Sequence, residues 1–85
     1  MHDSLLFEKT YRAVRDLCEN HAIKKVNQIK LIVSMDSHMD GPHLLRHMMD
    51  RDDALFGDWT NIIVEKGDTE TQTMVVESIN GEKDD

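Results

Sequence analysis

The N-terminal part of the chain has the hydrophobic period of an α-helix. From Leu5 to about His21, charged residues alternate with a stripe that repeats every three or four positions. Because residues three and four apart share one face of a helix, this pattern predicts an amphipathic helix capped by Asp3 or Ser4. The stripe comprises Leu6, Thr10, Ala13, Val14, Leu17, Cys18 and His21, and the last two are expected to be packed side chains.

The period then shortens. Between about Val26 and Ser34, β-branched residues dominate, which predicts a strand. After the loop "MDSHMDGP", Asp40 can cap a second helix that has Pro42 in its first turn. This helix is expected over Gly41–Arg51, with its core side supplied by Leu44, Leu45, Met48 and Met49.

Two further β-rich runs, "TNIIVEK" and "TQTMVVESI", are separated by "GDTE", which favours a hairpin. Residues 80–85, "NGEKDD", are expected to form a flexible acidic tail. The element order is α-β-α-β-β. We therefore predict a small two-layer α+β domain over residues 1–79, a three-stranded sheet with two helices packed on it.

Composition narrows the function classes. The 85 residues carry a net charge of −7, which disfavours nucleic acid and anionic membranes as partners. No apolar run approaches a membrane span and no signal-peptide pattern is present, so a cytoplasmic protein is expected. The single Cys18 is incompatible with an internal disulfide framework or a Cys-based structural zinc site. No nucleophile–base set or phosphate loop is visible, so we do not expect an enzyme.

The N-terminus offers one set of metal ligands. The α-amine of Met1, the backbone amides of His2 and Asp3, and the His2 ring could surround an ion with small chelate rings. A flat set of four nitrogens suits Ni(II) or Cu(II). A histidine at the second position can equally have no role.

A second set lies around the second helix. Asp36, His38, Asp40, His43 and His47 are clustered in sequence, and His43 and His47 are one helical turn apart. Asp40, His43 and His47 would form one stripe that is turned away from the core. Such residues also occur on ordinary solvated helix faces, and capping alone explains Asp40.

Taken together, "MHD", "CENHAIKKVNQIKLIV", "SMDSHMDGPHLL" and "NIIVEK" resemble the hydrogenase nickel-insertion accessory family called HypA. The resemblance implies a nickel-binding metallochaperone whose metal site comprises Met1, His2, Asp3 and Asp40. His38, His43 and His47 are further candidates that the family pattern does not supply. The implied partners are a nickel-loading GTPase and [NiFe]-hydrogenase maturation proteins, or urease accessory proteins.

The chain departs from the family pattern at one place. Family members carry a zinc ribbon with two Cys-x-x-Cys pairs between the last two strands, where this chain has only "EKGDTETQT". We therefore expect bound Ni(II) but no structural zinc. The alternative hypothesis is a metal-free protein-interaction module that retains the fold and has lost the metal chemistry.

Overall fold

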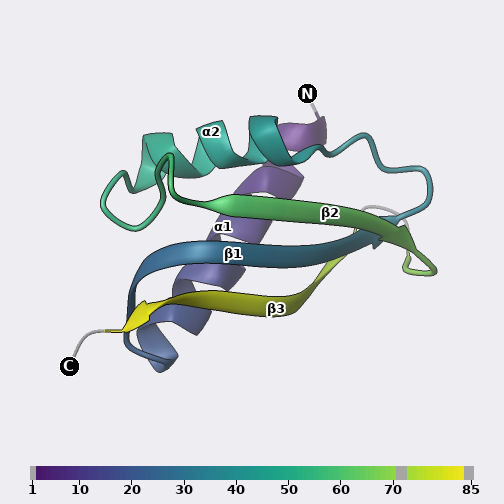
Figure 1. Cartoon of the computed structure of the whole chain (residues 1–85). Helices are drawn as coiled ribbons and strands as arrows, with labels where there is room; N and C mark the ends of the chain where they lie inside the picture. The colour runs from purple at the N-terminus through teal and green to yellow at the C-terminus, as the bar shows by residue number, and fades with distance from the viewer. Residues whose placement is uncertain (1, 71–72, 84–85) are drawn as a thin grey trace.

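The chain forms two helices and a three-stranded mixed sheet (Figure 1). A computed structural model describes residues 2–70 and 73–83, with side chains from Leu5 onward. The elements are α1 (His2–Asn20), β1 (Ile23–Ser34), α2 (Gly41–Arg51), β2 (Asn61–Gly67) and β3 (Met74–Lys83). The predicted α+β fold with the order α-β-α-β-β is confirmed, and α2 has the predicted bounds. The first helix and the first strand each begin three residues earlier than predicted.

The strand order is β2-β1-β3, with β2 parallel and β3 antiparallel to β1. The predicted hairpin between β2 and β3 is therefore wrong, because the two strands lie on opposite sides of β1. β1 is the most buried strand, with Val26, Ile29, Leu31 and Val33 fully enclosed. A strand of this kind gains most when it is paired along both edges, so it takes the centre of the sheet.

β1, α2 and β2 form a β-α-β unit. Parallel neighbours cannot be joined by a tight turn, and α2 supplies the long crossover connection that they need. β2 ends at Gly67 on one edge of the sheet, and β3 begins at Met74 on the other edge. Adjacent strands are about 4.8 Å apart, so a six-residue connection can readily pass one intervening strand.

Both helices cover the same face of the sheet. α1 lies against β1 and β3, whereas α2 lies against β2; Figure 1 shows α1 crossing behind the strands. Between these layers lies a core that includes Val14, Cys18, Leu44, Met48 and Phe56. The predicted burial of Cys18 and of the second helix's apolar side is confirmed, but His21 is exposed at the end of α1.

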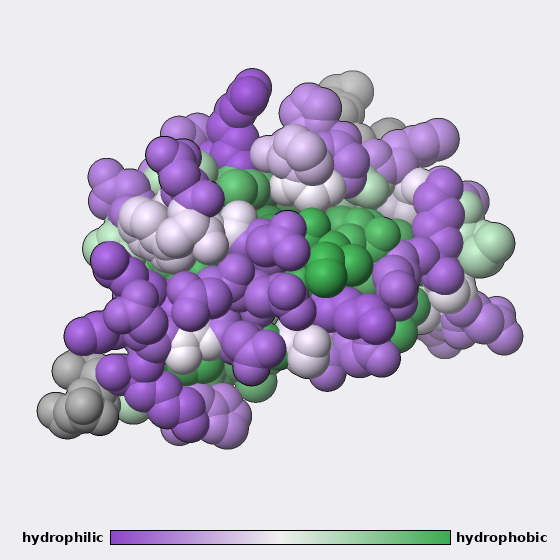
Figure 2. Space-filling view, in the orientation of Figure 1, coloured by the Kyte–Doolittle hydropathy of each residue, from purple (hydrophilic) through white to green (hydrophobic). Residues whose placement is uncertain are grey.

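The other face of the sheet is not covered by a helix. There Lys30 lies between Glu65 and Glu77, with Nζ–carboxylate distances of 3.4 Å and 3.3 Å. Figure 2 shows an apolar area on this side within a mostly hydrophilic surface, and Val75 is 50% exposed. None of the described helices is both long enough and apolar enough to cross a membrane.

The C-terminal end of the sheet is longer than the sequence predicted. Residues 80–83, expected in the tail, belong to β3 and pair with β1 as far as Ile23. Residues 84–85, the rest of that expected tail, lie outside the described residues.

Candidate metal centre

The N-terminal candidates lie at the start of α1. Met1 is outside the described residues, and α1 begins at His2 and continues through Asp3. The first four backbone N–H groups of an α-helix have no carbonyl partner within the helix. The amides of His2 and Asp3 are therefore not committed to the helical ladder, and they fit the donor set that a planar nickel site requires.

Asp40 lies at the start of the other helix, where it is the N-cap of α2. Its extended backbone lets the side chain turn back, so that Oδ1 accepts a hydrogen bond from the His43 N–H at 2.9 Å. The second carboxylate oxygen, Oδ2, accepts a hydrogen bond from the His43 ring at Nδ1, at 2.6 Å. Both oxygens of Asp40 are thus engaged by His43.

These contacts favour the ionised form of Asp40 and select the tautomer of a neutral His43 ring. The backbone hydrogen bond from His43, and then the ring hydrogen bond, lower the pKa of Asp40. The ionised carboxylate can only accept hydrogen bonds, so the proton of a neutral His43 ring is on Nδ1. The lone pair on Nε2 is then free, on a side chain that is 69% exposed. A histidine held in this way by a carboxylate has the tautomer that metal-ligating histidines usually have.

His47 faces a different group. Its Nε2 donates a hydrogen bond to Glu8 of α1 at 3.2 Å, and its ring lies 5.7 Å from the ring of Phe7, centre to centre. Only 25% of its side chain is exposed. His47 therefore packs between the helices, and the predicted outward stripe of Asp40, His43 and His47 is wrong at this position.

Glu8 is the charged residue of the helix interface that the sequence did not single out. Besides His47 it pairs with Arg51 of α2 and with Arg12 one turn further along α1. Partial burial opposes its charge, but the hydrogen bond from His47 and the positive charge of Arg51 lower its pKa overall. Glu8 belongs to no recognisable motif and lies on the predicted polar side of its helix. Its contact with the second helix therefore could not be predicted from the sequence.

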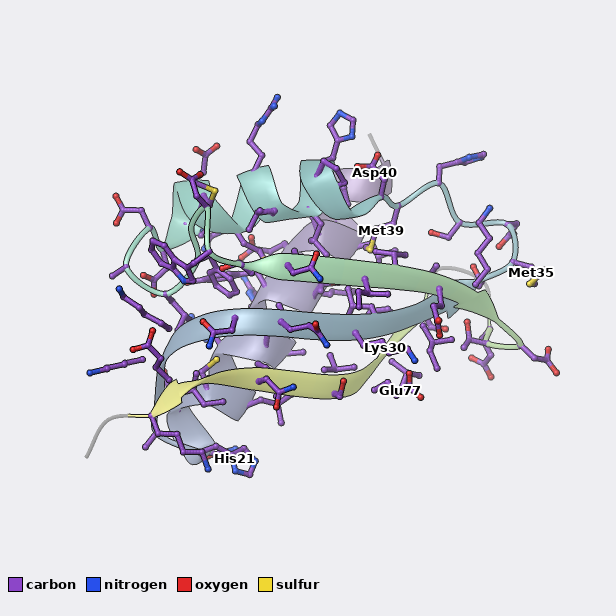
Figure 3. All side chains as sticks on the ribbon, viewed as in Figure 1. His21, Lys30, Met35, Met39, Asp40 and Glu77 are labelled. Atoms are coloured by element: carbon purple, nitrogen blue, oxygen red, sulfur yellow. The ribbon has the colours of Figure 1, made fainter. Side chains whose placement is uncertain are left out.

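The remaining candidates are in the loop between β1 and α2. Asp36 accepts a hydrogen bond from the Ser34 hydroxyl, and His38 is exposed. Between His38 and the cap, Met39 is buried and fixes the loop against the core (Figure 3). Among the described side chains, no three His, Cys, Asp or Glu groups gather closely enough to hold a metal ion. The described part of the second candidate set is therefore not a preformed metal site.

The two helices that carry the candidates start at the same end of the molecule. Phe7 lies against His47, and four residues later Tyr11 lies beneath the guanidinium of Arg51, 5.0 Å from the ring centre. The second contact lies four residues further along both helices than the first. α1 and α2 therefore run in the same general direction where they touch. Figure 1 shows the first turn of α1 emerging at the end where α2 begins.

Comparison of the chain with protein-family models, with curated proteins and with solved structures gave no match. The resemblance to the HypA family rests on the residues quoted from the sequence.

Proposed function

We propose that this chain is a nickel-binding, metallochaperone-like domain that holds Ni(II) for delivery during hydrogenase or urease maturation. In a chain that starts at Met1, the ligands are the α-amine, the amides of His2 and Asp3, and the His2 imidazole. Asp40 remains a candidate at the edge of this set.

One observation carries the proposal: α1 begins at His2. The amide nitrogens of residues 2 and 3 belong to the first turn of α1, so they have no carbonyl partner within the helix. The start of α1 thus supports the use of the amides as ligands.

The chemistry predicts a steep dependence on pH. Binding requires a neutral amine and a neutral imidazole, whose ordinary pKa values are about 7.7–8 and 6.5. The amide nitrogens must also lose their protons, which only a strongly polarising late divalent metal can promote. Affinity should therefore rise with pH, and Cu(II) should compete with Ni(II) because it binds such a set more tightly.

The delivery step is proposed from the family resemblance. A terminal site is reached from solvent, and exchange of its ligands with those of a partner needs no opening of the core. The partner classes that the resemblance implies are a nickel-loading GTPase and hydrogenase or urease maturation proteins. The net charge of −7 suits a carrier of a divalent cation.

Calorimetric titration of Ni(II) into the untagged chain tests the proposal. The His2→Ala variant should lose at least tenfold in affinity, since it lacks the only side-chain nitrogen of the set (about 1.4 kcal/mol per tenfold). A chain extended before Met1 should lose binding as well, because its α-amine is replaced by an amide. Equal binding by the native, His2→Ala and extended chains would refute the site. No binding by any of them would favour the metal-free interaction module.

A further inference from the structure

A pocket of about 360 Å³ lies where α1 ends and β1 begins. Its walls come from the last turns of α1, the connection into β1 and the loop after α2. Figure 1 shows that loop and the start of β1 at the same end of the molecule. The lining includes Arg15, Cys18, Glu19, Lys24, Asp52 and Leu55.

Asp52 holds the part of the wall that the loop contributes. It is the C-cap of α2, where its N–H donates to the Met48 carbonyl at 2.9 Å. Its Oδ1 accepts the backbone N–H groups of Ala54 and Leu55, at 3.2 Å and 3.1 Å. The buried side chains of Leu55 and Cys18 supply the apolar part of the lining. The pocket is therefore formed before any ligand enters it.

Charges of both signs line this pocket without neutralising one another. The cations are Arg15 and Lys24, and the acids are Glu19 and Asp52. Within the described part of the chain, none of these four side chains forms an ion pair with another of the four. After burial itself, the charges of Asp52 and Glu19 are what raise the pKa of the Cys18 thiol. Both acids therefore lie near the apolar part of the lining.

Arg15 has a hydrogen-bond donor that lacks a partner. Its Nε is buried and forms no hydrogen bond with the described residues. The guanidinium lies 5.7 Å from the ring centre of Tyr11, and Nη2 is 3.5 Å from Asp16. A buried N–H without an acceptor costs free energy, and a carboxylate can satisfy it by accepting from two guanidinium nitrogens at once. Because 43% of the Arg15 side chain is exposed, it has room to turn toward a ligand.

We propose that this pocket binds a small zwitterion, a free α-amino acid with an aliphatic side chain, with its carboxylate on Arg15 and its ammonium group on Asp52. Lys24 and Glu19 supply a second charge of each sign, and the aliphatic side chain packs against Leu55. A simple anion would meet the two acids and a simple cation the two bases, so a ligand with both charges is the one that complements the whole lining. The site is at the opposite end of α1 from the nickel ligands and does not depend on the proposed function.

The test compares three probes by amide NMR of the native chain. L-leucine carries both charges, L-leucinamide only the ammonium charge, and isocaproate only the carboxylate. L-leucine should shift the signals of Ala22, Ala54 and Leu55 and leave those of the first turn of α2 unmoved. It should bind at least about tenfold more tightly than either single-charge probe, because each of these lacks one charged contact. Equal binding of the three probes, or unmoved pocket signals with L-leucine, would overturn the proposal.

Substitutions then assign the two charges. Arg15→Gln should weaken L-leucine by about tenfold and leave L-leucinamide unchanged, whereas Asp52→Asn should weaken L-leucine equally and leave isocaproate unchanged. Asn keeps an acceptor oxygen for the loop amides, and circular dichroism checks that each variant is folded. Arg46→Gln is the matched control, since Arg46 is an exposed arginine of α2 outside the lining. If Arg15→Gln binds L-leucine like the native chain, or weakens both leucine probes equally, the proposal is overturned. Should a variant fail to fold, the three probes on the native chain still decide.

Discussion

His47 of α2 donates a hydrogen bond to Glu8 of α1, a residue 39 positions earlier in the chain, at 3.2 Å. The same carboxylate forms an ion pair with Arg51, which lies one turn further along α2. Two positions of one helix thus converge on a single acid of the other. Since the Glu8 side chain is only 19% exposed, this contact contributes more than an ordinary surface ion pair and holds α1 against α2.

The Glu8 contact should make the stability of the domain sensitive to acid. The folded-state pKa of Glu8 is lowered from its ordinary value of 4.5, so its pairs stabilise the fold above that pH. As the pH falls through the lower folded-state pKa, the carboxylate is protonated and this stabilisation is lost. Glu8→Gln should therefore lower the urea midpoint at pH 7 and flatten its decline between pH 5 and pH 3.

Glu82→Gln provides the control, because Glu82 is an exposed acid of β3. Its urea midpoint should follow the native pH profile. A Glu8→Gln profile parallel to that of the native chain would show that Glu8 does not link the helices in solution.

Thr60 ties the segment before β2 to the central strand. Its hydroxyl donates to the Val26 carbonyl at 2.7 Å and accepts the Gly57 N–H at 3.1 Å, in a buried position. Thr60→Val keeps the shape but leaves both groups unpaired, which should cost about 1–3 kcal/mol in the free energy of unfolding. Urea denaturation at constant m value measures this loss.

Thr10→Val is the matched variant for Thr60. Thr10 is also fully buried, but its hydroxyl donates to the Leu6 carbonyl within the same helix, at 2.8 Å. That carbonyl lies in the helical ladder, where a backbone N–H can still reach it, so Thr10→Val should change stability by less than about 0.5 kcal/mol. Equal losses in the two variants would contradict the bridging role of Thr60.

Cys18 should be chemically silent while the domain is folded. Burial, and then the nearby charges of Asp52 and Glu19, raise the pKa of its thiol to about 11. At pH 8 only about 0.1% of the thiol is then ionised, and the side chain is 2% exposed. A disulfide reagent should react with it at least about 100-fold more slowly than with the chain in urea. Fast reaction under native conditions would place Cys18 at the surface.

The elements of this fold are largely encoded in local patterns, whereas their pairing is not. The sequence predicted the type and order of all five elements, because each has a clear period or cap, such as Asp40 before Gly41. "GDTE" suggested a hairpin because turn residues look alike in short and long connections. What placed β1 in the centre is its burial on one face and pairing on both edges, which are properties of the assembled sheet.

The extension of β3 to Lys83 is hidden from sequence patterns for a similar reason. Asn80-Gly81 has the composition of a turn, yet Gly81 lies within β3 at an irregularity in its pairing with β1. A Cβ at this position would lie 2.2 Å from the Lys25 carbonyl oxygen, so the glycine permits a close approach of two strands. Such a contact joins residues far apart in sequence, and composition cannot reveal it.

In the candidate site, too, local features could be predicted from the sequence and tertiary contacts could not. The cap by Asp40 follows from a local rule, and so does the position of His43 one turn before His47. The direction of His47 depends on Glu8, and hence on how α1 and α2 pack. Helical spacing therefore placed His43 and His47 in one group, although His43 contacts the cap Asp40 and His47 contacts Glu8 of the other helix.

Ala22 is the strained position of the chain. It is the described non-glycine residue with a positive φ, 57°, in the two-residue connection between α1 and β1. A side chain in this left-handed region costs about 1–2 kcal/mol, while glycine costs about 0.5–1 kcal/mol through the larger entropy of its unfolded chain. Ala22→Gly should therefore raise the free energy of unfolding by about 0.5–1 kcal/mol in urea denaturation.

The matched substitution is Ala13→Gly, in the interior of α1, where the backbone is helical. There glycine relieves no strain and should lower the free energy of unfolding by about 1 kcal/mol. The two variants make the same chemical change, so their opposite signs would isolate the backbone conformation as the cause. If Ala22→Gly destabilises the domain as much as Ala13→Gly does, residue 22 is not left-handed in solution, and the tight connection from α1 into β1 must be formed in another way.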